Sequence, residues 1–208
     1  MTTTPMDLFA ATARLERLPL ADAEVFYLPA LKLGQAYECI LHELITNVPW
    51  RHENVVVWGK QFPQPRLIAW YGDLSRNYSY SGIKLTPMPW NRLLLDIKDR
   101  IEAVTGGSFN SVLLNYYRDN RDSMGFHSDD EKELGPRPTI ASLSLGDERI
   151  FVLKHKIDKL AKVVRMRLAS GSLLVMKGET QKFWKHGIAK EARPCGPRVN
   201  LTFRNIVA

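Results

Sequence analysis

Three residues with metal-ligating side chains stand in two short stretches in the second half of the chain. His127 and Asp129 are two positions apart, so in extended backbone their side chains point the same way and can bind one metal ion. A second histidine, His186, lies in a later stretch. Two histidines and one carboxylate form a facial triad, which leaves adjacent coordination positions open. This set favours the chemistry of a non-haem Fe(II) oxygenase, in which a co-substrate chelates the iron and O2 binds beside it.

The stretch Arg198–Arg204 alternates polar and apolar residues, which predicts a strand. Its polar face carries Arg198, Asn200, Thr202 and Arg204. Two guanidiniums on one face suit a dicarboxylate, because a guanidinium binds a carboxylate through two parallel hydrogen bonds. Taken alone, the pattern favours an ordinary edge strand with solvated arginines. The triad upstream favours instead a pocket for 2-oxoglutarate, and Asn115 and Tyr117 could donate hydrogen bonds to the same acid.

The elements that must position these residues change character along the chain. Residues 1–33 are expected to be irregular, and amphipathic helices are predicted at 35–48 and 90–105. From residue 108 onward, short apolar stretches are separated by Gly, Pro, Asn and Asp. They predict seven strands, at 109–118, 139–145, 149–156, 162–168, 172–177, 183–188 and 199–206. Strands without intervening helices favour a sandwich or jelly roll.

Two stretches of the first half carry aromatic residues that could contact a nucleic-acid base. Residues 55–60 predict a hairpin with Trp58 at its tip, a wedge suited to enter a base stack. A tryptophan buried at the end of a core strand would explain this pattern equally well. Tyr78 and Tyr80 would lie on one face of a short strand, where a base could stack. Ordinary sheet packing is the commoner cause of such alternation.

The composition is that of an ordinary globular protein with a net positive charge. The formal net charge is +7, so nucleic acid is worth considering as a partner. Cys39 and Cys195 lie far apart and form neither a disulfide framework nor a paired zinc motif, which fits a reducing compartment. No apolar run has the length of a membrane span. We expect a cytoplasmic monomer with no membrane contact, associated with the nucleoid if bacterial and nuclear if eukaryotic.

Several spaced motifs, in a fixed order, together resemble the AlkB family. They are Asn115–Tyr117, His127–Glu131, Ser170–Met176, His186 and Pro197–Arg204. The AlkB proteins are Fe(II)/2-oxoglutarate dioxygenases that remove alkyl groups from nucleic-acid bases. The similarity covers about residues 50 to 207 and is strongest to the branch that acts on double-stranded DNA.

The resemblance implies an α+β fold with a C-terminal double-stranded β-helix, or jelly roll, and an N-terminal part that includes helices and a hairpin-containing substrate lid. Residues 1–52 would form an N-terminal extension and a support helix. Residues 53–106 would form the nucleotide-recognition lid, the wedge hairpin and a second support helix. Residues 107–208 would form the catalytic core, and all three sections would make one compact unit.

The resemblance also implies roles for individual residues. The iron ligands would be His127, Asp129 and His186. The 2-oxoglutarate site would comprise Asn115, Tyr117, Arg198, Asn200, Thr202 and Arg204. The substrate contacts would be the hairpin residues Trp58, Gly59 and Lys60, the lid residues Tyr78, Ser79 and Tyr80, and the acidic Asp130 and Glu131. A carboxylate near the iron would favour a cationic methylated base over its neutral parent, although a solvated acidic loop is the alternative for these two acids.

The expected activity is repair of alkylated DNA by oxidative demethylation of N1-methyladenine and N3-methylcytosine, with Fe(II) as the metal and 2-oxoglutarate and O2 as co-substrates. Formaldehyde, succinate and CO2 would be released. Double-stranded DNA is the favoured substrate, with single-stranded DNA and RNA as further candidates. One alternative is the same chemistry on RNA, protein or a small molecule. Another is a non-catalytic β-domain that binds nucleic acid and whose triad is incidental or holds a structural metal.

Overall fold

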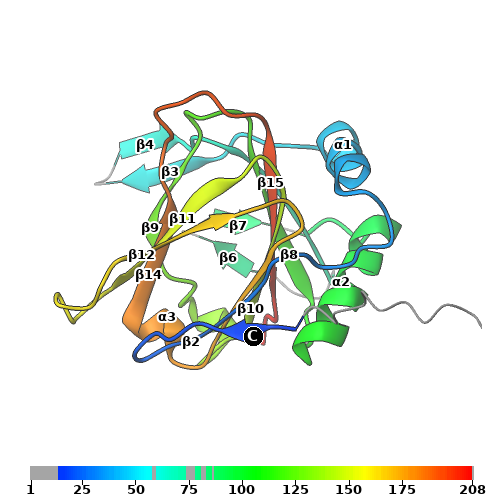
Figure 1. Cartoon of the computed structure of the whole chain (residues 1–208). Coiled ribbons are helices and arrows are strands. Elements are labelled where there is room, and N and C mark those ends of the chain that lie inside the picture. The colour runs from blue at the N-terminus through cyan, green and yellow to red at the C-terminus, as the bar shows by residue number, and fades with distance from the viewer. Residues whose placement is uncertain (1–13, 58–59, 74–77, 81–82, 86, 208) are drawn as a thin grey trace, which may run out of the picture.

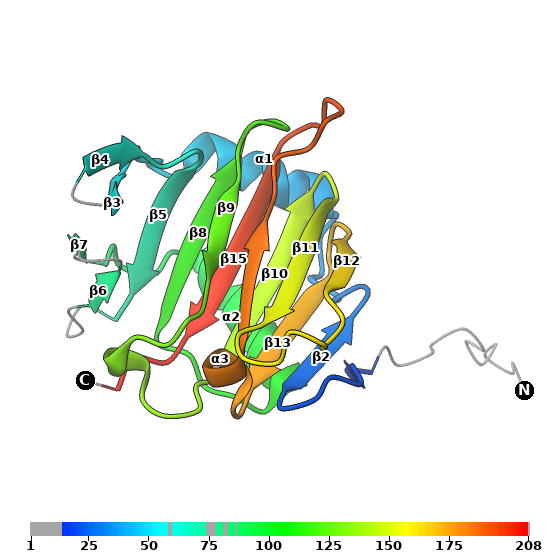
Figure 2. The ribbon, with the colours of Figure 1, turned by 90° about the vertical axis from the view of Figure 1, so that its left-hand side faces the viewer.

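Two antiparallel sheets pack face to face, and two helices cover the outer face of the larger sheet (Figures 1 and 2). The computed structural model describes residues 14–57, 60–73, 78–80, 83–85 and 87–207. None of the helices within these residues is long and apolar enough to span a membrane. The two-sheet arrangement confirms the predicted α+β class with a jelly-roll core.

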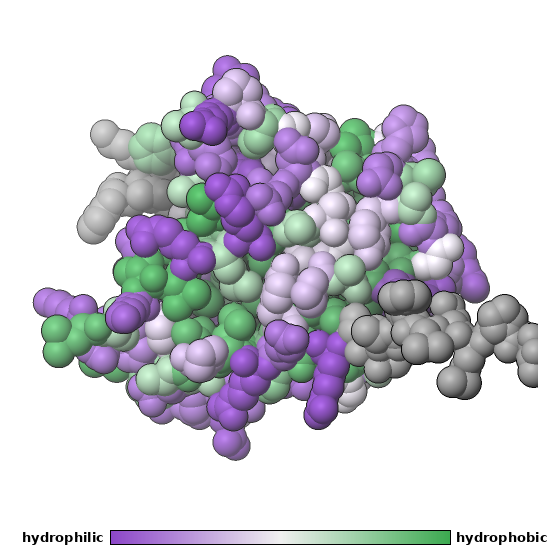
Figure 3. Space-filling view, viewed as in Figure 1, coloured by the Kyte–Doolittle hydropathy of each residue, from purple (hydrophilic) through white to green (hydrophobic). Residues whose placement is uncertain are grey.

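Within the described residues, the larger sheet has seven strands in the order β1-β2-β13-β10-β15-β8-β5. Their bounds are β1 Glu16–Arg17, β2 Glu24–Leu28, β5 Leu67–Gly72, β8 Ser111–Tyr117, β10 Ile140–Gly146, β13 Leu173–Lys177 and β15 Arg198–Arg204. The smaller sheet has the order β12-β11-β14-β9. Its strands are β9 Met124–His127, β11 Arg149–His155, β12 Val164–Leu168 and β14 Trp184–Ile188. The turn between β11 and β12 projects at the lower left of Figure 1, and hydrophobic and hydrophilic surface alternate at the same side of Figure 3. Ile157 and Leu160 of this turn are exposed.

Two helices close the outer face of the larger sheet. They are α1 Tyr37–Asn47 and α2 Arg92–Thr105. The Asn91 side chain accepts a hydrogen bond from the Leu94 backbone N–H at 2.9 Å and so caps the start of α2. Gly106 ends α2 in the left-handed conformation (φ 65°), which glycine adopts without steric cost. Two short helical turns, η1 Lys132–Leu134 and α3 Thr180–Phe183, border the smaller sheet.

The core has two apolar layers, and β15 contributes apolar residues only to the layer beneath the helices. The odd-numbered residues of β15 pack with α1 and α2 on one side of the larger sheet; they are Val199, Leu201 and Phe203. The even-numbered residues face the space between the sheets. An interior strand with one apolar and one polar face therefore places a polar patch inside the sandwich.

The main differences from the sequence-based expectations concern strands outside the predicted set. All seven predicted strands are present, but the first 33 residues are not all irregular, because β2 is an interior strand of the larger sheet. β5 and β9 were not predicted, and β9 contains a glycine, which is uncommon in strands. β15 lies between β10 and β8 and is not an edge strand. The larger sheet thus takes strands from all three predicted sections of the chain.

Two short hairpins adjoin β5 at the side of the larger sheet (Figure 2). One joins β3 Asn54–Val57 to β4 Lys60–Pro63, and the other joins β6 Tyr78–Tyr80 to β7 Ile83–Leu85. Val57 pairs with Lys60, as expected for the predicted wedge hairpin. Trp58 and Gly59 lie outside the described residues, and the side chains of Lys60 and residues 78–80 are also outside the described part.

Candidate metal centre and acid pocket

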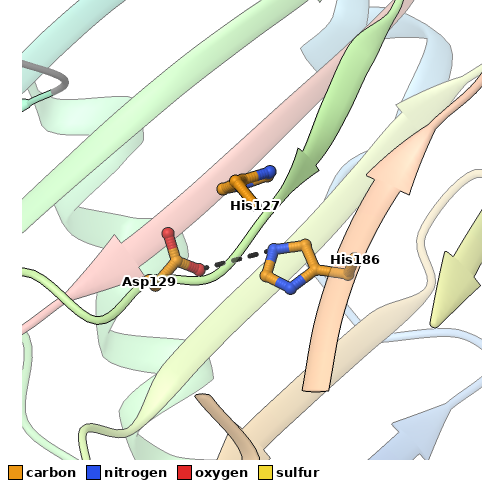
Figure 4. A group of neighbouring side chains, drawn as sticks. All are labelled: His127, Asp129 and His186. Atoms are coloured by element: carbon orange, nitrogen blue, oxygen red, sulfur yellow. Dashed lines mark ion pairs between the residues drawn. The ribbon is translucent and has the colours of Figure 1, made fainter. Parts of the chain in front are cut away.

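The predicted triad comes together between the two sheets. His127 ends β9, Asp129 follows it, and His186 lies at the centre of β14 directly opposite His127 (Figure 4). Each residue offers one ligand atom, and these atoms lie within 4.8 Å of one another. One ion could therefore contact all three side chains.

Hydrogen bonding and burial put the triad in the protonation state that binds a metal. The Nδ1 atom of His127 lies 3.0 Å from the Gly125 carbonyl oxygen, which can only accept, so Nδ1 carries the proton and Nε2 keeps its lone pair. Burial lowers the pKa of His127, and burial together with His127 lowers the pKa of His186 to about 3. Burial alone would raise the pKa of Asp129, but Arg204 and the two histidines hold this pKa well below its usual range. At neutral pH both imidazoles are neutral and the carboxylate is charged.

The two oxygens of Asp129 have different surroundings. Oδ1 accepts a hydrogen bond from Arg204 Nη2 at 2.6 Å. Oδ2 is buried, has no hydrogen-bond partner among the described residues, and lies 3.6 Å from His186 Nε2. A buried carboxylate oxygen without a donor is costly, and a cation bound beside it would remove that cost. The residues present therefore fit a divalent metal.

A side chain of α3 and a backbone carbonyl of β14 hold the loop that carries Asp129. The Ser128 hydroxyl donates to the Trp184 carbonyl at 2.9 Å, and the Asp129 backbone N–H donates to Gln181 Oε1 at 2.9 Å. Gln181 is buried in α3. No sequence signal pointed to this role, because a single glutamine has no recognisable spacing to the triad.

The polar face of β15 lies beside the triad, as predicted, and adjacent strands widen it. Arg198 pairs across the sheet with Tyr117, and Asn200 pairs with Asn115. On the other side, β10 places Ser142 opposite Thr202 and Ser144 opposite Asn200. One pocket contains the triad and this patch; its polar lining residues are Asn115, Tyr117, His127, Asp129, Ser142, His186, Arg198, Asn200, Thr202 and Arg204.

Arg198 supplies a buried positive charge at one end of this pocket. The residue is 2% exposed, and its Nη2 donates to Ser144 Oγ at 2.9 Å. Its Nε and Nη1 have no hydrogen-bond partner, and no carboxylate pairs with it among the described residues. Its guanidinium lies 5.1 Å from the centre of the Tyr117 ring. Because a buried charge without a counter-ion is unfavourable, this end of the pocket fits a carboxylate of a bound acid.

The hydrogen bonds of two asparagines distinguish their roles. Asn115 Oδ1 accepts from Arg66 Nε at 2.7 Å, which leaves the Asn115 amide N–H groups for the pocket. Asn200 Nδ2 instead donates to Ser142 Oγ at 2.8 Å and to the Leu143 carbonyl at 2.9 Å. The Asn200 Oδ1 atom accepts from the Thr202 hydroxyl at 3.0 Å. Asn200 and Thr202 thus line the pocket with their donors already used inside the protein.

Comparison with known proteins agrees with this geometry. The family model for the 2OG-Fe(II) oxygenase superfamily matches residues 25–204. The human Alpha-ketoglutarate-dependent dioxygenase alkB homolog 3 is 43% identical over 196 residues, covering 90% of this chain and 68% of the relative. This chain belongs to the AlkB family of the 2OG-Fe(II) oxygenase superfamily. The human DNA oxidative demethylase ALKBH2 is 46% identical over 160 residues, covering 74% of this chain and 61% of the relative.

Two solved structures share the fold of this chain at low sequence identity. OsALKBH1 matches with a TM-score of 0.63 and 19% identity, over 92% of this chain and 99% of that one. A 2OG-Fe(II) oxygenase family oxidoreductase from Burkholderia pseudomallei matches with a TM-score of 0.57 and 14% identity, over 88% of this chain and 86% of that one. The chain spans 60% of the length of a further relative, mouse alkB homolog 3, at 44% identity over 175 residues.

Membership of this superfamily confirms the predicted metal and co-substrates. The superfamily uses Fe(II), 2-oxoglutarate and O2. The triad offers the nitrogen and oxygen ligands that suit Fe(II), and the pocket beside it has an unpaired buried guanidinium for the acid. The family and the geometry therefore agree at both ends of the pocket.

Of the residues predicted to contact the substrate, only the side chains of Asp130 and Glu131 lie in the described part of the chain. Asp130 is exposed, and its carboxylate pairs with Lys156 Nζ at 3.1 Å in a surface groove separate from the triad pocket. Glu131 is partly buried just before η1. The structure thus does not bring the Asp130 carboxylate into the pocket. Contacts of these acids, of residues 58–60 and of residues 78–80 with a base remain predictions.

Proposed function

We propose that this chain is an Fe(II)- and 2-oxoglutarate-dependent dioxygenase that removes methyl groups from N1-methyladenine and N3-methylcytosine in DNA. The observation that carries the proposal is the placement of a His-Asp-His triad and an unpaired buried arginine in one pocket. The nucleic-acid substrate is supported by relatives at 43–46% identity, one of which is named a DNA oxidative demethylase.

The residues of the chain would act mainly by holding and orienting the reactants. When bound, the iron with 2-oxoglutarate and O2 would supply oxidation of the N-methyl group, with release of formaldehyde, succinate and CO2. His127, Asp129 and His186 would hold the metal on one side and leave its other side open. Arg198 would bind the far carboxylate of 2-oxoglutarate, and Asn115 would donate to the same acid from the neighbouring strand.

The chemistry of the lesion explains why such an enzyme would select it. Methylation at N1 of adenine or N3 of cytosine leaves the base cationic and blocks its pairing edge. A base that pairs badly costs less to extrude from a duplex than a normal base does. The formal net charge of +7 would favour association with the phosphate backbone.

The activity can be tested directly with an oligonucleotide that contains 1-methyladenine or 3-methylcytosine, incubated with Fe(II), 2-oxoglutarate and ascorbate. We expect the unmethylated base and an equal amount of formaldehyde. His127→Ala should remove both products, whereas His42→Ala, at an exposed position on α1, should leave them unchanged. A wild-type protein that binds iron and 2-oxoglutarate but releases no formaldehyde from either lesion contradicts the proposal. The same lesions in RNA would show whether RNA is the better substrate.

The preference for duplex DNA is proposed from the hairpin of β3 and β4. The pairing of Val57 with Lys60 leaves two residues, Trp58 and Gly59, to connect the strands. If Trp58 fills the gap left by an extruded base, Trp58→Ala should lower kcat/KM on duplex DNA by about tenfold, which is in the lower part of the range for loss of a stacked base. The loss on single-stranded DNA should be smaller. Phe62→Ala is the matched control, because Phe62 is an exposed aromatic residue of the same hairpin (48% exposed). Equal losses on both substrates would remove the wedge role.

A further inference from the structure

Arg149, the first residue of β11, is fully buried outside the triad pocket (0% exposed). Its Nη1 donates to the Asp119 carbonyl at 3.2 Å. Its Nη2 donates to the Asp122 carbonyl at 2.8 Å and to the Ala189 carbonyl at 2.6 Å. A guanidinium that donates hydrogen bonds to three backbone carbonyls holds the segments that carry them in place, and in this sense Arg149 is a brace.

The braced carbonyls belong to two loops that lead into the pocket. Residues 118–123 connect β8 to β9, and residues 189–197 connect β14 to β15. The loops are also joined to each other, because Glu191 N–H donates to the Asn120 carbonyl at 2.9 Å and Asn120 Nδ2 donates to the Glu191 carbonyl at 3.1 Å. The Glu191 carboxylate turns inward and lies 3.7 Å from Arg149 Nε. The first loop leads to His127 and the second to Arg198, so the Arg149 side chain stabilises both of the loops that precede these pocket residues.

Arg149 also contacts the pocket wall through an aromatic ring. Its guanidinium lies 5.6 Å from the centre of the Tyr117 ring, and the Arg198 guanidinium lies 5.1 Å from the same centre. Both distances are within the range of cation–π attraction. Tyr117 lines the pocket and pairs with Arg198 across β8 and β15. The Tyr117 ring is therefore in cation–π range of both the buried Arg149 and the pocket residue Arg198.

We propose that Arg149 is a positioning residue for the far-carboxylate end of the 2-oxoglutarate site. It holds the Tyr117 ring and the loop before Arg198 in the arrangement that receives the far carboxylate, and it adds a second buried positive charge behind that site. The inference rests on the use of 2-oxoglutarate by this family and does not depend on the nucleic-acid substrate. It assigns no contact between Arg149 and the co-substrate, because Arg149 does not line the pocket.

The test compares two acids that differ only at the far end. 2-Oxoglutarate and 2-oxopentanoate have the same carbon chain and the same chelating 2-oxo acid group, but 2-oxopentanoate lacks the far carboxylate. Each is titrated into Fe(II)-loaded protein under anaerobic conditions, and Kd is measured from the visible absorption of the chelate and by calorimetry. Arg149→Met should raise the Kd of 2-oxoglutarate about tenfold or more, as removal of a supporting residue does at metal sites, and should leave the Kd of 2-oxopentanoate within about twofold.

Arg167→Met is the matched control. Arg167 lies on β12 opposite Ile150, next to Arg149 in the sheet, and its side chain is 64% exposed and paired with Glu148. This variant removes one positive charge of the same type without touching either loop, so both Kd values should stay at the wild-type level. A rise for Arg167→Met equal to that for Arg149→Met would show a general charge effect and overturn the positioning role.

Two further outcomes would overturn the inference. Equal weakening of both acids by Arg149→Met would indicate a general loss of structure, and unchanged binding of both would show that the brace has no effect on the site. If Arg149→Met does not fold, Arg149→Lys replaces it, because a lysine keeps the charge but cannot reproduce the planar set of donors. The same selective loss is expected for Arg149→Lys. These titrations contain no nucleic acid, so their outcome does not depend on the proposed substrate. A failed demethylation assay would contradict the proposed substrate, and the titrations would still decide the role of Arg149.

Discussion

The two ends of the pocket differ in how their charges are compensated. At the metal end, Asp129 has Arg204 at 2.6 Å, and both histidines are held neutral, so the protein balances its own charge there. At the acid end, Arg198 is buried with no carboxylate partner among the described residues. Burial lowers the pKa of Arg198, and the charge of Arg149 acts in the same direction. The metal end therefore has its charges partly compensated within the protein, with only Asp129 Oδ2 left without a donor, whereas the acid end has a buried positive charge that a carboxylate of the co-substrate would neutralise.

Removing a ligand at the metal end should have the largest effect. His127→Ala should lower activity by more than the roughly 10- to 100-fold typical of losing a mere supporting residue of a metal site. The visible absorption of the Fe(II)–2-oxoglutarate chelate should disappear in an anaerobic titration of the same variant. His42→Ala should keep both signals. A His127→Ala protein with the full absorption band would show that His127 is not a ligand of the iron.

Substitutions of the two arginines of β15 should have different kinetic effects, because the two residues lie at different ends of the pocket. Arg198→Ala removes the unpaired guanidinium and should chiefly raise the KM for 2-oxoglutarate, by about 10- to 100-fold from the roughly 1.5–3 kcal/mol of a charged hydrogen bond. Arg204→Ala removes the partner of Asp129 and should also lower kcat. Steady-state kinetics with varied 2-oxoglutarate at saturating iron measure the difference. The same change in KM and kcat for both variants would contradict a division of the pocket into two ends.

A smaller effect is expected from the support of the metal end. Gln181→Leu removes the acceptor of the Asp129 N–H and should weaken Fe(II) binding about tenfold, within the range for supporting residues. At saturating iron its KM for 2-oxoglutarate should stay at the wild-type value. Lys182→Met, at the next position of α3 and exposed, should change neither quantity. A raised KM for 2-oxoglutarate with unchanged iron binding would show that Gln181 supports the acid end of the pocket and not the metal end.

The sequence predicted the parts of the site that depend on spacing within one strand. The two-residue spacing of His127 and Asp129 and the alternation along Arg198–Arg204 were enough, because side chains two apart on a strand point the same way. The residues of β10 that pair with the polar face of β15 were out of reach, since register is set by strand pairing that a single stretch does not reveal. Ser142 and Ser144 were missed for this reason, and Arg66, just before β5, was missed as well.

Burial and hydrogen bonding also changed the roles of some predicted residues. The alternation placed Asn200 on the correct face, but only the structure shows that its donors are already used. β2 was predicted as irregular because prolines surround it, whereas tertiary pairing with β13 makes it a strand. Arg149 gave no signal at all, because an arginine at the start of an apolar strand usually lies at the surface.

The position of β15 has a consequence for how the chain folds as it is synthesised. Its two partners, β8 and β10, come much earlier in the sequence, yet neither pairs with the other. The larger sheet therefore cannot close until residues 198–204 have left the ribosome, and pairing over such sequence distances is slow. A nascent chain that stops before Arg198 would leave two inner strand edges unpaired, which are sites for aggregation. β15 emerges after both of its partners, and it joins the sheet together and completes the pocket.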